Sequence, residues 1–168
     1  MISIVKQLAF FNKPKLLNFA SMEDVSINII NNSNHPLPIY STPGSSGMDL
    51  RANLDTPLFL QPQERQLIPT GLFIELPKGY EAQVRPRSGL AIKQGITCLN
   101  SPGTIDSDYR GEIKVILINL SSDIQAIAPG DRIAQMVVSK VERASWQLVD
   151  KLGDTSRNIG GFGHSGKD

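Results

Sequence analysis

Short apolar runs separated by turn-forming residues make up most of the chain from residue 25 to residue 149. In the first run, Val25, Ile27 and Ile29 alternate with mostly polar neighbours, a pattern typical of a half-buried strand. Later runs recur at roughly 8–12-residue spacing and are interrupted by Pro and Gly. They cover residues 58–60, 66–68, 72–76, 80–84, 124–128 and 133–141. This rhythm predicts an all-β domain built as a sandwich or a barrel.

Two segments depart from this rhythm. Residues 88–95 predict the one short helix of the domain, with Ser88 as its cap and Gly95 at its end. The run over residues 112–120 starts amphipathic and becomes apolar on both faces. A strand covered on both sides is expected either at the centre of a sheet or at a subunit interface.

The two ends of the chain do not follow the strand pattern. Residues 1–21 carry three lysines and no acid, and Pro14 interrupts their short apolar piece. We expect a loosely ordered N-terminal extension rather than a secretory signal, with Met22 as a hypothetical natural start. Residues 153–168 are rich in glycine and have no periodicity. The expected organisation is therefore an extension at 1–21, a β domain at 22–152 and a flexible glycine-rich arm at 153–168.

The composition narrows the classes of function. With 168 residues, 40% of them hydrophobic and 20% charged, the chain fits one globular domain. A net charge of +1 gives no strong attraction to nucleic acid or to a membrane, so neither is an expected partner. The one cysteine, Cys98, cannot form an internal disulfide, which favours a reducing, cytoplasmic location. Its apolar neighbours predict a buried, inert thiol.

The candidate chemistry begins in the loop between two apolar runs, at residues 100–111. In an extended segment, Asp106 and Asp108 would point the same way. A polar loop held between apolar strands is a common place for a reactive site. Taken alone, this loop is equally well an acidic turn that only solvates the connection, and Asp108 is expected to brace it.

A second candidate lies near the C-terminus. Residues 161–167 match the G-x-x-x-x-G-K pattern of a phosphate-binding P-loop, but no strand precedes them and the chain ends where a helix should follow. We reject a P-loop fold. The bare backbone of the glycines, with Arg157, Ser165 and Lys167, still suits phosphate, and Phe162 has no core to join and could stack on a planar ligand.

Five polar clusters follow one another along the chain, at residues 47–52, 86–91, 103–111, 130–135 and 157–166. In this order and spacing they resemble the five motifs of the trimeric dUTP pyrophosphatases (dUTPases). The resemblance runs from about Val25 to the C-terminus, and five motifs in order are far more specific than one. Two positions depart from the usual motifs, Ala91, where some relatives have Gly, and Thr104, where a larger apolar residue is common.

The resemblance implies a jelly-roll-like subunit that forms a homotrimer with active sites shared between subunits. The reaction would convert dUTP and water to dUMP and pyrophosphate with Mg²⁺, which limits uracil in DNA and supplies dUMP for thymidylate synthesis. Asp106 matches the general base, because a carboxylate near a water can take its proton during attack on the α-phosphorus. Tyr109 matches the residue under the deoxyribose, where its ring leaves no room for a 2′-hydroxyl.

The same resemblance assigns the remaining contacts. Asn100 would read the uracil edge with its amide, helped by backbone groups of Gly103, Thr104 and Ile105. The residues that would contact phosphate or close over the nucleotide are Arg87, Ser88, Gly89, Gln135, Arg157, Phe162, Gly163 and Ser165. Asp49 would hold waters of the metal, since Mg²⁺ keeps its waters and binds mainly to substrate phosphates. Lys114 could reach substrate or could be an ordinary exposed lysine.

Two other functions remain open from the sequence. A dCTP deaminase of the same fold would need a group that activates water at the cytosine ring, whereas this loop offers Asp-Ser-Asp-Tyr. A non-catalytic jelly-roll module that only binds nucleotide would have no evident need for all five motifs.

Overall fold

The structure is a computed structural model that describes residues 24–159. It is built from antiparallel strands and one short helix. In chain order the elements are β1 (Asn28–Asn31), β2 (Met48–Arg51), β3 (Leu58–Leu60), β4 (Arg65–Pro69), β5 (Leu72–Glu75), β6 (Tyr80–Arg85), α1 (Ser88–Gln94), β7 (Ile96–Cys98), β8 (Gly103–Ile105), β9 (Lys114–Asn119), β10 (Gln125–Ile127) and β11 (Arg132–Lys140). The all-β prediction with one short helix is confirmed for this part of the chain. Here no helix is long and apolar enough to cross a membrane.

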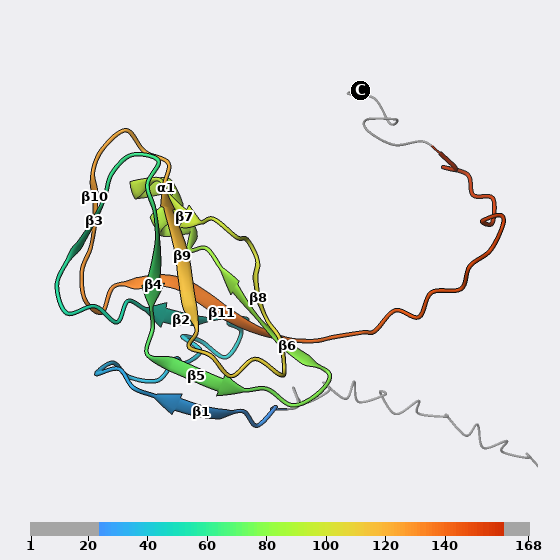
Figure 1. Cartoon of the computed structure of the whole chain (residues 1–168), viewed down its shortest axis with the longest axis horizontal. Helices are drawn as coiled ribbons and strands as arrows, with labels where there is room; N and C mark the ends of the chain where they lie inside the picture. The colour runs from blue at the N-terminus through green and yellow to red at the C-terminus, as the bar shows by residue number, and fades with distance from the viewer. Residues whose placement is uncertain (1–23, 160–168) are drawn as a thin grey trace, which may run out of the picture.

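The strands form two larger sheets and two small ones (Figure 1). The four-stranded sheet has the order β2-β11-β6-β8 and the three-stranded sheet has the order β4-β9-β7, while β1 pairs with β5 and β10 with β3. Strands that are neighbours in space are mostly distant in sequence, so long connections cross between the sheets. The apolar side chains between the sheets form one core that includes Leu50, Ile68, Val84 and Leu117.

Strand β9 is the middle strand of its sheet. Val115, Leu117 and Asn119 point to its buried face, and Ile116 and Ile118 on the other face are only partly covered. Of the two expected positions, the centre of a sheet is observed, because β9 pairs with β4 on one side and β7 on the other. A role in a subunit interface stays a prediction. The fully buried Asn119 donates hydrogen bonds to the Leu60 carbonyl at 3.0 Å and the Asp123 carbonyl at 2.8 Å, which satisfies its amide inside the core.

The helix begins at Ser88, the residue that was expected to cap it. Ser88 is the first helical residue, and the N-cap is Arg87, which is extended and makes no side-chain capping bond. The prediction that Ser88 caps the helix is therefore wrong. The predicted end is confirmed, since Gly95 has φ 66° and its N–H bonds to the Ala91 carbonyl at 3.1 Å. A left-handed conformation at this point suits glycine because it has no Cβ.

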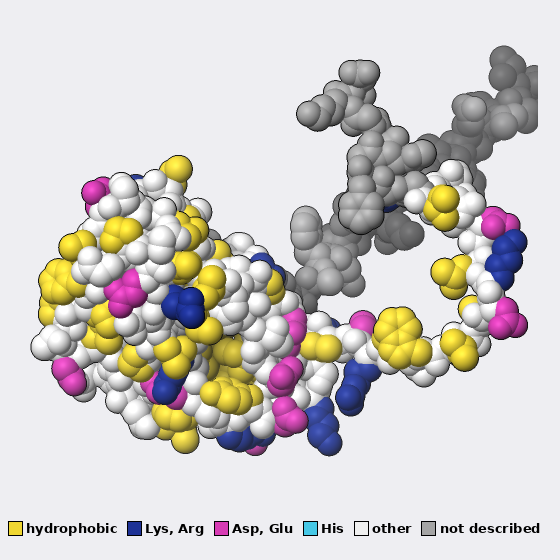
Figure 2. Space-filling view, turned by 45° about the horizontal axis from the view of Figure 1, so that its top comes forward, with side chains coloured by type: hydrophobic (Ala, Val, Ile, Leu, Met, Phe, Trp, Pro, Cys, Tyr) yellow, Lys and Arg dark blue, Asp and Glu magenta, His cyan; other side chains and the backbone are white. Residues whose placement is uncertain are grey.

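The last strand ends at Lys140, and the chain then leaves the sheets. The Val141 N–H still bonds to the Gly79 carbonyl at 2.9 Å. Residues 141–159 contain no strand or helix and project from the β domain (Figures 1 and 2). The apolar piece at residues 146–149 lies here, with Trp146 92% exposed. The expected N-terminal extension at 1–21 lies outside the described residues, as does the part of the glycine-rich arm after residue 159.

Candidate active site

A polar pocket of about 200 Å³ opens at one edge of the four-stranded sheet. Its lining residues are Asp49, Arg87, Ser88, Gly89 and Gln135. Strand β11 brings them together, because Gln135 lies opposite Asp49 of β2 on one side and opposite Arg85 of β6 on the other. Arg87 to Gly89 follow directly after β6. Expected phosphate contacts from two separate motifs therefore line one pocket, and Asp49 from a third motif lines it with them.

Two guanidinium groups hold the carboxylate in this pocket. Arg87 Nε lies 2.9 Å from Asp49 Oδ1, and Arg132 Nη1 lies 3.0 Å from Asp49 Oδ2. Arg87 also donates from Nη1 to the Arg132 carbonyl at 2.8 Å. Two cations share one anion, so the cluster carries a net positive charge, which favours a bound anion such as phosphate.

Arg132 is a residue that the sequence reasoning missed. In a regular strand, positions 132 and 135 would face opposite sides of the sheet. The register of β11 against β2 shifts between Arg132 and Ala134, so that Arg132 lies opposite Arg51 and shares a face with Asp49 and Gln135. A β-bulge of this kind redirects a side chain and leaves no local signal in the alternation of residues. Only the position of Arg132 inside the fourth motif could have pointed to it.

The side-chain amide of Gln135 lies between the backbone of Pro86 and that of Gly47. Its Nε2 donates to the Pro86 carbonyl at 3.2 Å. A Cβ at Gly47 would come within 2.6 Å of Gln135 Oε1 and 3.3 Å of Val137 Cγ2. The absence of a side chain at position 47 therefore leaves the room that the Gln135 amide occupies at the pocket.

The loop at residues 100–111 forms the second part of the site. Its strand β8 pairs with β6, with Gly103 opposite Val84 and Ile105 opposite Ala82. The flanking strands β7 and β9 pair with each other in the other sheet, so the expected hairpin-like connection spans both sheets. Strand β6 thus carries the pocket at its C-terminal end and supports the loop along its length.

Asn100 and Gly103, the expected uracil readers, lie against each other. A Cβ at Gly103 would approach Asn100 Nδ2 to 2.8 Å, so the amide occupies the space over the glycine. Gly103 and Ile105 are buried, whereas Thr104 between them is exposed. The side chain of Asn100 is thereby placed over the backbone of β8.

Asp106 and Tyr109 lie on the exposed turn that follows β8. The Tyr109 N–H bonds to the Asp106 carbonyl at 3.1 Å, and the Tyr109 hydroxyl donates to the Glu112 carbonyl at 3.0 Å. A Cβ at Gly111 would overlap the Tyr109 hydroxyl, so the ring requires glycine there. Within the described chain, the turn is braced by Arg110, which donates to the carbonyls of Ser107 and Tyr109, and not by Asp108 as expected.

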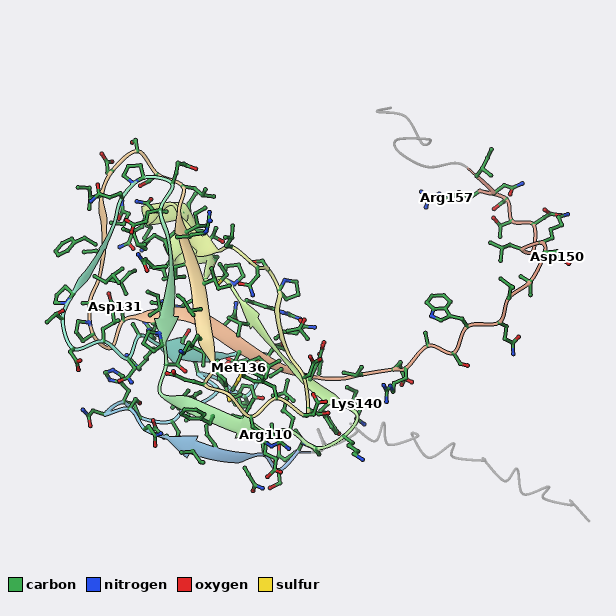
Figure 3. The ribbon with its side chains drawn as sticks, viewed as in Figure 1. Arg110, Asp131, Met136, Lys140, Asp150 and Arg157 are labelled. Carbon is green, nitrogen blue, oxygen red and sulfur yellow. The ribbon has the colours of Figure 1, made fainter. Side chains whose placement is uncertain are left out.

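Two further candidates, and the cysteine that was expected to be inert, lie apart from this centre. Lys114 Nζ lies 3.5 Å from Glu112 Oε2 and its side chain is 42% exposed, which favours an ordinary strand lysine. Figure 3 places Arg157 on the projecting segment, away from Arg110 and the sheets. Cys98 is buried at the end of β7, and burial raises the pKa of its thiol to about 11, as expected for an inert cysteine. The expected contacts Phe162, Gly163 and Ser165 lie outside the described residues.

Comparison with known proteins identifies the family. The dUTPase family model matches residues 33–166. The deoxyuridine 5′-triphosphate nucleotidohydrolase of Finegoldia magna is 58% identical over 142 residues, which cover 84% of this chain and 99% of the relative. The protein of the same name from Cytophaga hutchinsonii is 57% identical over 153 residues, which cover 91% of this chain and 99% of the relative.

Solved structures support the same fold. The dUTPase of Staphylococcus bacteriophage 80alpha with dUPNHPP aligns with a TM-score of 0.72 at 21% identity, covering 84% of this chain and 98% of that one. A mutant dUTPase from phage phi11 of S. aureus, described with a structural Mg(II) ion, aligns with a TM-score of 0.68 at 20% identity, covering 77% of this chain and all of that one. The jelly-roll-like prediction is thereby confirmed, and the chain belongs to the dUTPase family.

Proposed function

We propose that this chain hydrolyses dUTP to dUMP and diphosphate. The observation that carries the proposal is that one strand, β6, supports both parts of the site. It leads into the pocket, where two guanidinium groups contact the one carboxylate of Asp49. It also pairs with β8, the strand that precedes the exposed Asp106. Attack of water on a phosphate chain needs both parts, a positive site for the phosphates and a base for the water. Membership of the dUTPase family gives the substrate.

Asp106 is the proposed general base. A water oxygen attacks the α-phosphorus, the bond from that phosphorus to the bridging oxygen of the β-phosphate breaks, and the proton of the water passes to the carboxylate. Asp106 is exposed at the end of β8, and its backbone carbonyl accepts the Tyr109 N–H. An exposed carboxylate on a braced turn is suited to accept a proton and return it to solvent.

The nucleotide is proposed to lie along β6 between the two parts of the site. Arg87, Ser88, Gly89 and Gln135 would contact the phosphates, with the charge of Arg132 beside them. Asn100 with the backbone of residues 103–105 would read uracil. Tyr109 would pack under the deoxyribose, and its hydroxyl is fixed by the Glu112 carbonyl. A ring fixed at both ends can exclude a 2′-hydroxyl by its position alone.

Mg²⁺ is the cofactor implied by the family, and the residues of the pocket fit it. The described residues contain no group of three or more metal-binding side chains, and Mg²⁺ commonly binds one or two carboxylates through its waters together with substrate phosphates. Asp49 supplies one such carboxylate in the pocket, and because its two oxygens already contact Arg87 and Arg132, substrate phosphates would hold most of the ion. When bound, the ion would neutralise part of the phosphate charge.

The C-terminal residues are proposed to complete the site of a neighbouring copy in a homotrimer. Residues 141–159 project from their own β domain, and their apolar side chains, among them Trp146 and Leu148, are exposed (Figure 2). Arg157 lies on this segment (Figure 3) and would bind the terminal phosphate of a nucleotide held by the neighbour. Residues 153–168 would then act as an arm that closes over the nucleotide. In a cytoplasmic setting the reaction would limit dUTP and supply dUMP.

The deciding experiment is release of pyrophosphate from dUTP, UTP, dTTP and dCTP by the purified full-length chain. We expect turnover of dUTP alone, and loss of that turnover when residues 157–168 are deleted while the protein stays folded by circular dichroism. Release of ammonia from dCTP would instead indicate a deaminase. Nucleotide binding without turnover of any of the four would indicate a binding module.

A further inference from the structure

The turn that carries Asp106 and Tyr109 has little regular structure of its own. Residues 106–111 belong to no strand or helix, and most of them are exposed. Inside the turn, the bond from the Tyr109 N–H to the Asp106 carbonyl, at 3.1 Å, is the one backbone hydrogen bond that the described chain provides. A catalytic carboxylate must be held within a fraction of an ångström to act efficiently. Some other contact must therefore fix this turn.

Arg110 provides that contact. Its Nη1 donates to the Ser107 carbonyl at 2.8 Å and to the Tyr109 carbonyl at 2.9 Å, and its Nη2 donates to Glu75 Oε1 at 3.1 Å. The planar guanidinium thus binds two carbonyls of the turn and one carboxylate of β5 at the same time. A lysine could not reproduce this arrangement, because its ammonium is a single point of charge.

Glu75 is itself held from the other side. Its Oε2 accepts a hydrogen bond from Asn28 Nδ2 at 2.9 Å, and Asn28 is its partner in the register of β1 against β5. Figure 3 shows Arg110 beside this pair of strands. Within residues 106–111, Arg110 is the side chain that attaches the turn to the β1–β5 sheet, and just after the turn the Ile113 N–H bonds to the Leu72 carbonyl at 2.8 Å. This sheet supplies none of the expected nucleotide contacts.

We propose that Arg110 and Glu75 are a positioning pair that holds the 106–111 turn against β5 and so sets the placement of Asp106 and Tyr109. Glu75 touches no expected substrate group and acts through Arg110. Because both side chains are 53% exposed, the ion pair contributes little to the stability of the fold. Its loss should therefore change the geometry of the turn much more than the stability of the domain. The role in turnover rests on the proposed function.

Glu75→Ala in the full-length chain tests the pair, with Glu64→Ala as a matched control. Glu64 also accepts two hydrogen bonds, from the Gln61 N–H at 2.8 Å and from Gln66 Nε2 at 2.9 Å, but has no link to the turn. For Glu75→Ala we expect kcat for dUTP to fall about tenfold, with a smaller change in KM, because the base is misplaced. The preference for dUTP over UTP should also fall, because Tyr109 lies in the same turn. Glu75→Gln keeps an acceptor for Arg110 and should restore most of the activity.

Hydrogen exchange of the peptide covering residues 106–111 tests the same pair without relying on activity. We expect exchange about tenfold faster in Glu75→Ala than in Glu64→Ala or the parent chain. Equal exchange and equal kinetics in the two alanine variants would overturn the positioning role. If the parent chain releases no pyrophosphate from dUTP, the proposed function fails, and the exchange rates alone decide whether the pair holds the turn.

Discussion

The two parts of the candidate site are fixed in different ways. The pocket around Asp49 is built from neighbouring strands β2, β11 and β6, and two ion pairs of 2.9 Å and 3.0 Å connect its side chains. The turn at residues 106–111 has no strand of its own and depends on hydrogen bonds from Arg110 and Tyr109. In the pocket, the sheet itself sets the positions of the charges, whereas in the turn a few exposed side chains do.

This difference predicts how each part responds to substitution. Substitution of a charged side chain in the pocket removes charge but leaves the strands in place. It should therefore weaken binding of phosphate and leave the chemical step comparatively intact. A change in the turn alters the group that performs the chemical step, or its placement, so it should lower kcat. Comparison of kcat with KM across the variants therefore separates the two parts.

The largest effect is expected for Asp106→Asn in the turn. The amide keeps the shape of the side chain but cannot take a proton from water, so kcat should fall by about 100- to 10,000-fold. Binding of a non-hydrolysable dUTP analogue, measured by calorimetry, should change little. Pyrophosphate release at the rate of the parent chain would refute the role of Asp106 as the base.

The next effect is expected for Arg87→Ala in the pocket. The change removes one of the two cations that face Asp49 and leaves the carboxylate with Arg132 alone. A hydrogen bond to a charged group is worth about 1.5–3 kcal/mol, so KM should rise by about 10- to 100-fold. Arg87→Lys keeps the charge without the planar guanidinium, so its KM should lie between that of the parent chain and that of Arg87→Ala. A loss confined to kcat would contradict the division between pocket and turn.

The sequence predicts what depends on local pattern. Recurring apolar runs identified most of the strands, and Gly95 marked the end of α1. Apolar residues on both faces limited β9 to the centre of a sheet or a subunit interface, whereas β8 lies inside the segment that was expected to be a loop. Each correctly predicted feature is decided by residues close together in the chain. The motifs at residues 47–52, 86–91 and 130–135 also indicated side chains that the fold brings into one pocket.

Features that depend on pairing between distant strands could not be predicted. Arg132 reaches Asp49 only because β11 has a bulge opposite β2, and these residues lie 83 positions apart. Glu75 and Arg110 are 35 positions apart, and neither belongs to a pattern that names the other. The prediction of Ser88 as the cap of α1 was wrong for a related reason. Arg87 binds Asp49, a residue distant in the sequence, and the helix begins directly after Arg87.

Arg132→Ala should have a smaller effect than Arg87→Ala. Arg132 lies more exposed than Arg87, with side-chain exposures of 49% and 26%, so solvent screens its charge more strongly. We expect KM for dUTP to rise about three- to tenfold at low salt, and the difference from the parent chain to shrink as salt is added. Arg51→Ala is the matched control, because Arg51 lies opposite Arg132 but donates to the Gly130 carbonyl at 2.8 Å rather than to Asp49. Equal changes in KM for the two variants would show that Arg132 acts only through general charge.

The last prediction concerns the reactivity of the Cys98 thiol, where we expect the smallest effect on the site. Cys98 lies just before the loop that leads to the turn. Burial raises the pKa of its thiol to about 11, so at pH 8 about one thiol in a thousand is ionised. An unfolded cysteine, with a pKa of about 8.5, is about one quarter ionised at the same pH. Alkylation by iodoacetamide, followed by mass spectrometry, should be at least about 100-fold slower in the folded chain than in urea.

The pH dependence of the alkylation of Cys98 tests whether β7 stays closed while the neighbouring loop is more loosely held. Because the folded pKa is raised, the buried thiol favours the folded state fully below the unfolded pKa and loses that contribution as the pH rises towards about 11. Labelling of the folded chain should therefore accelerate throughout the range above pH 8. If the folded chain reacted as fast as the unfolded one at pH 8, β7 would open along with the loop, and the looser part of the site would extend from the turn into the sheet.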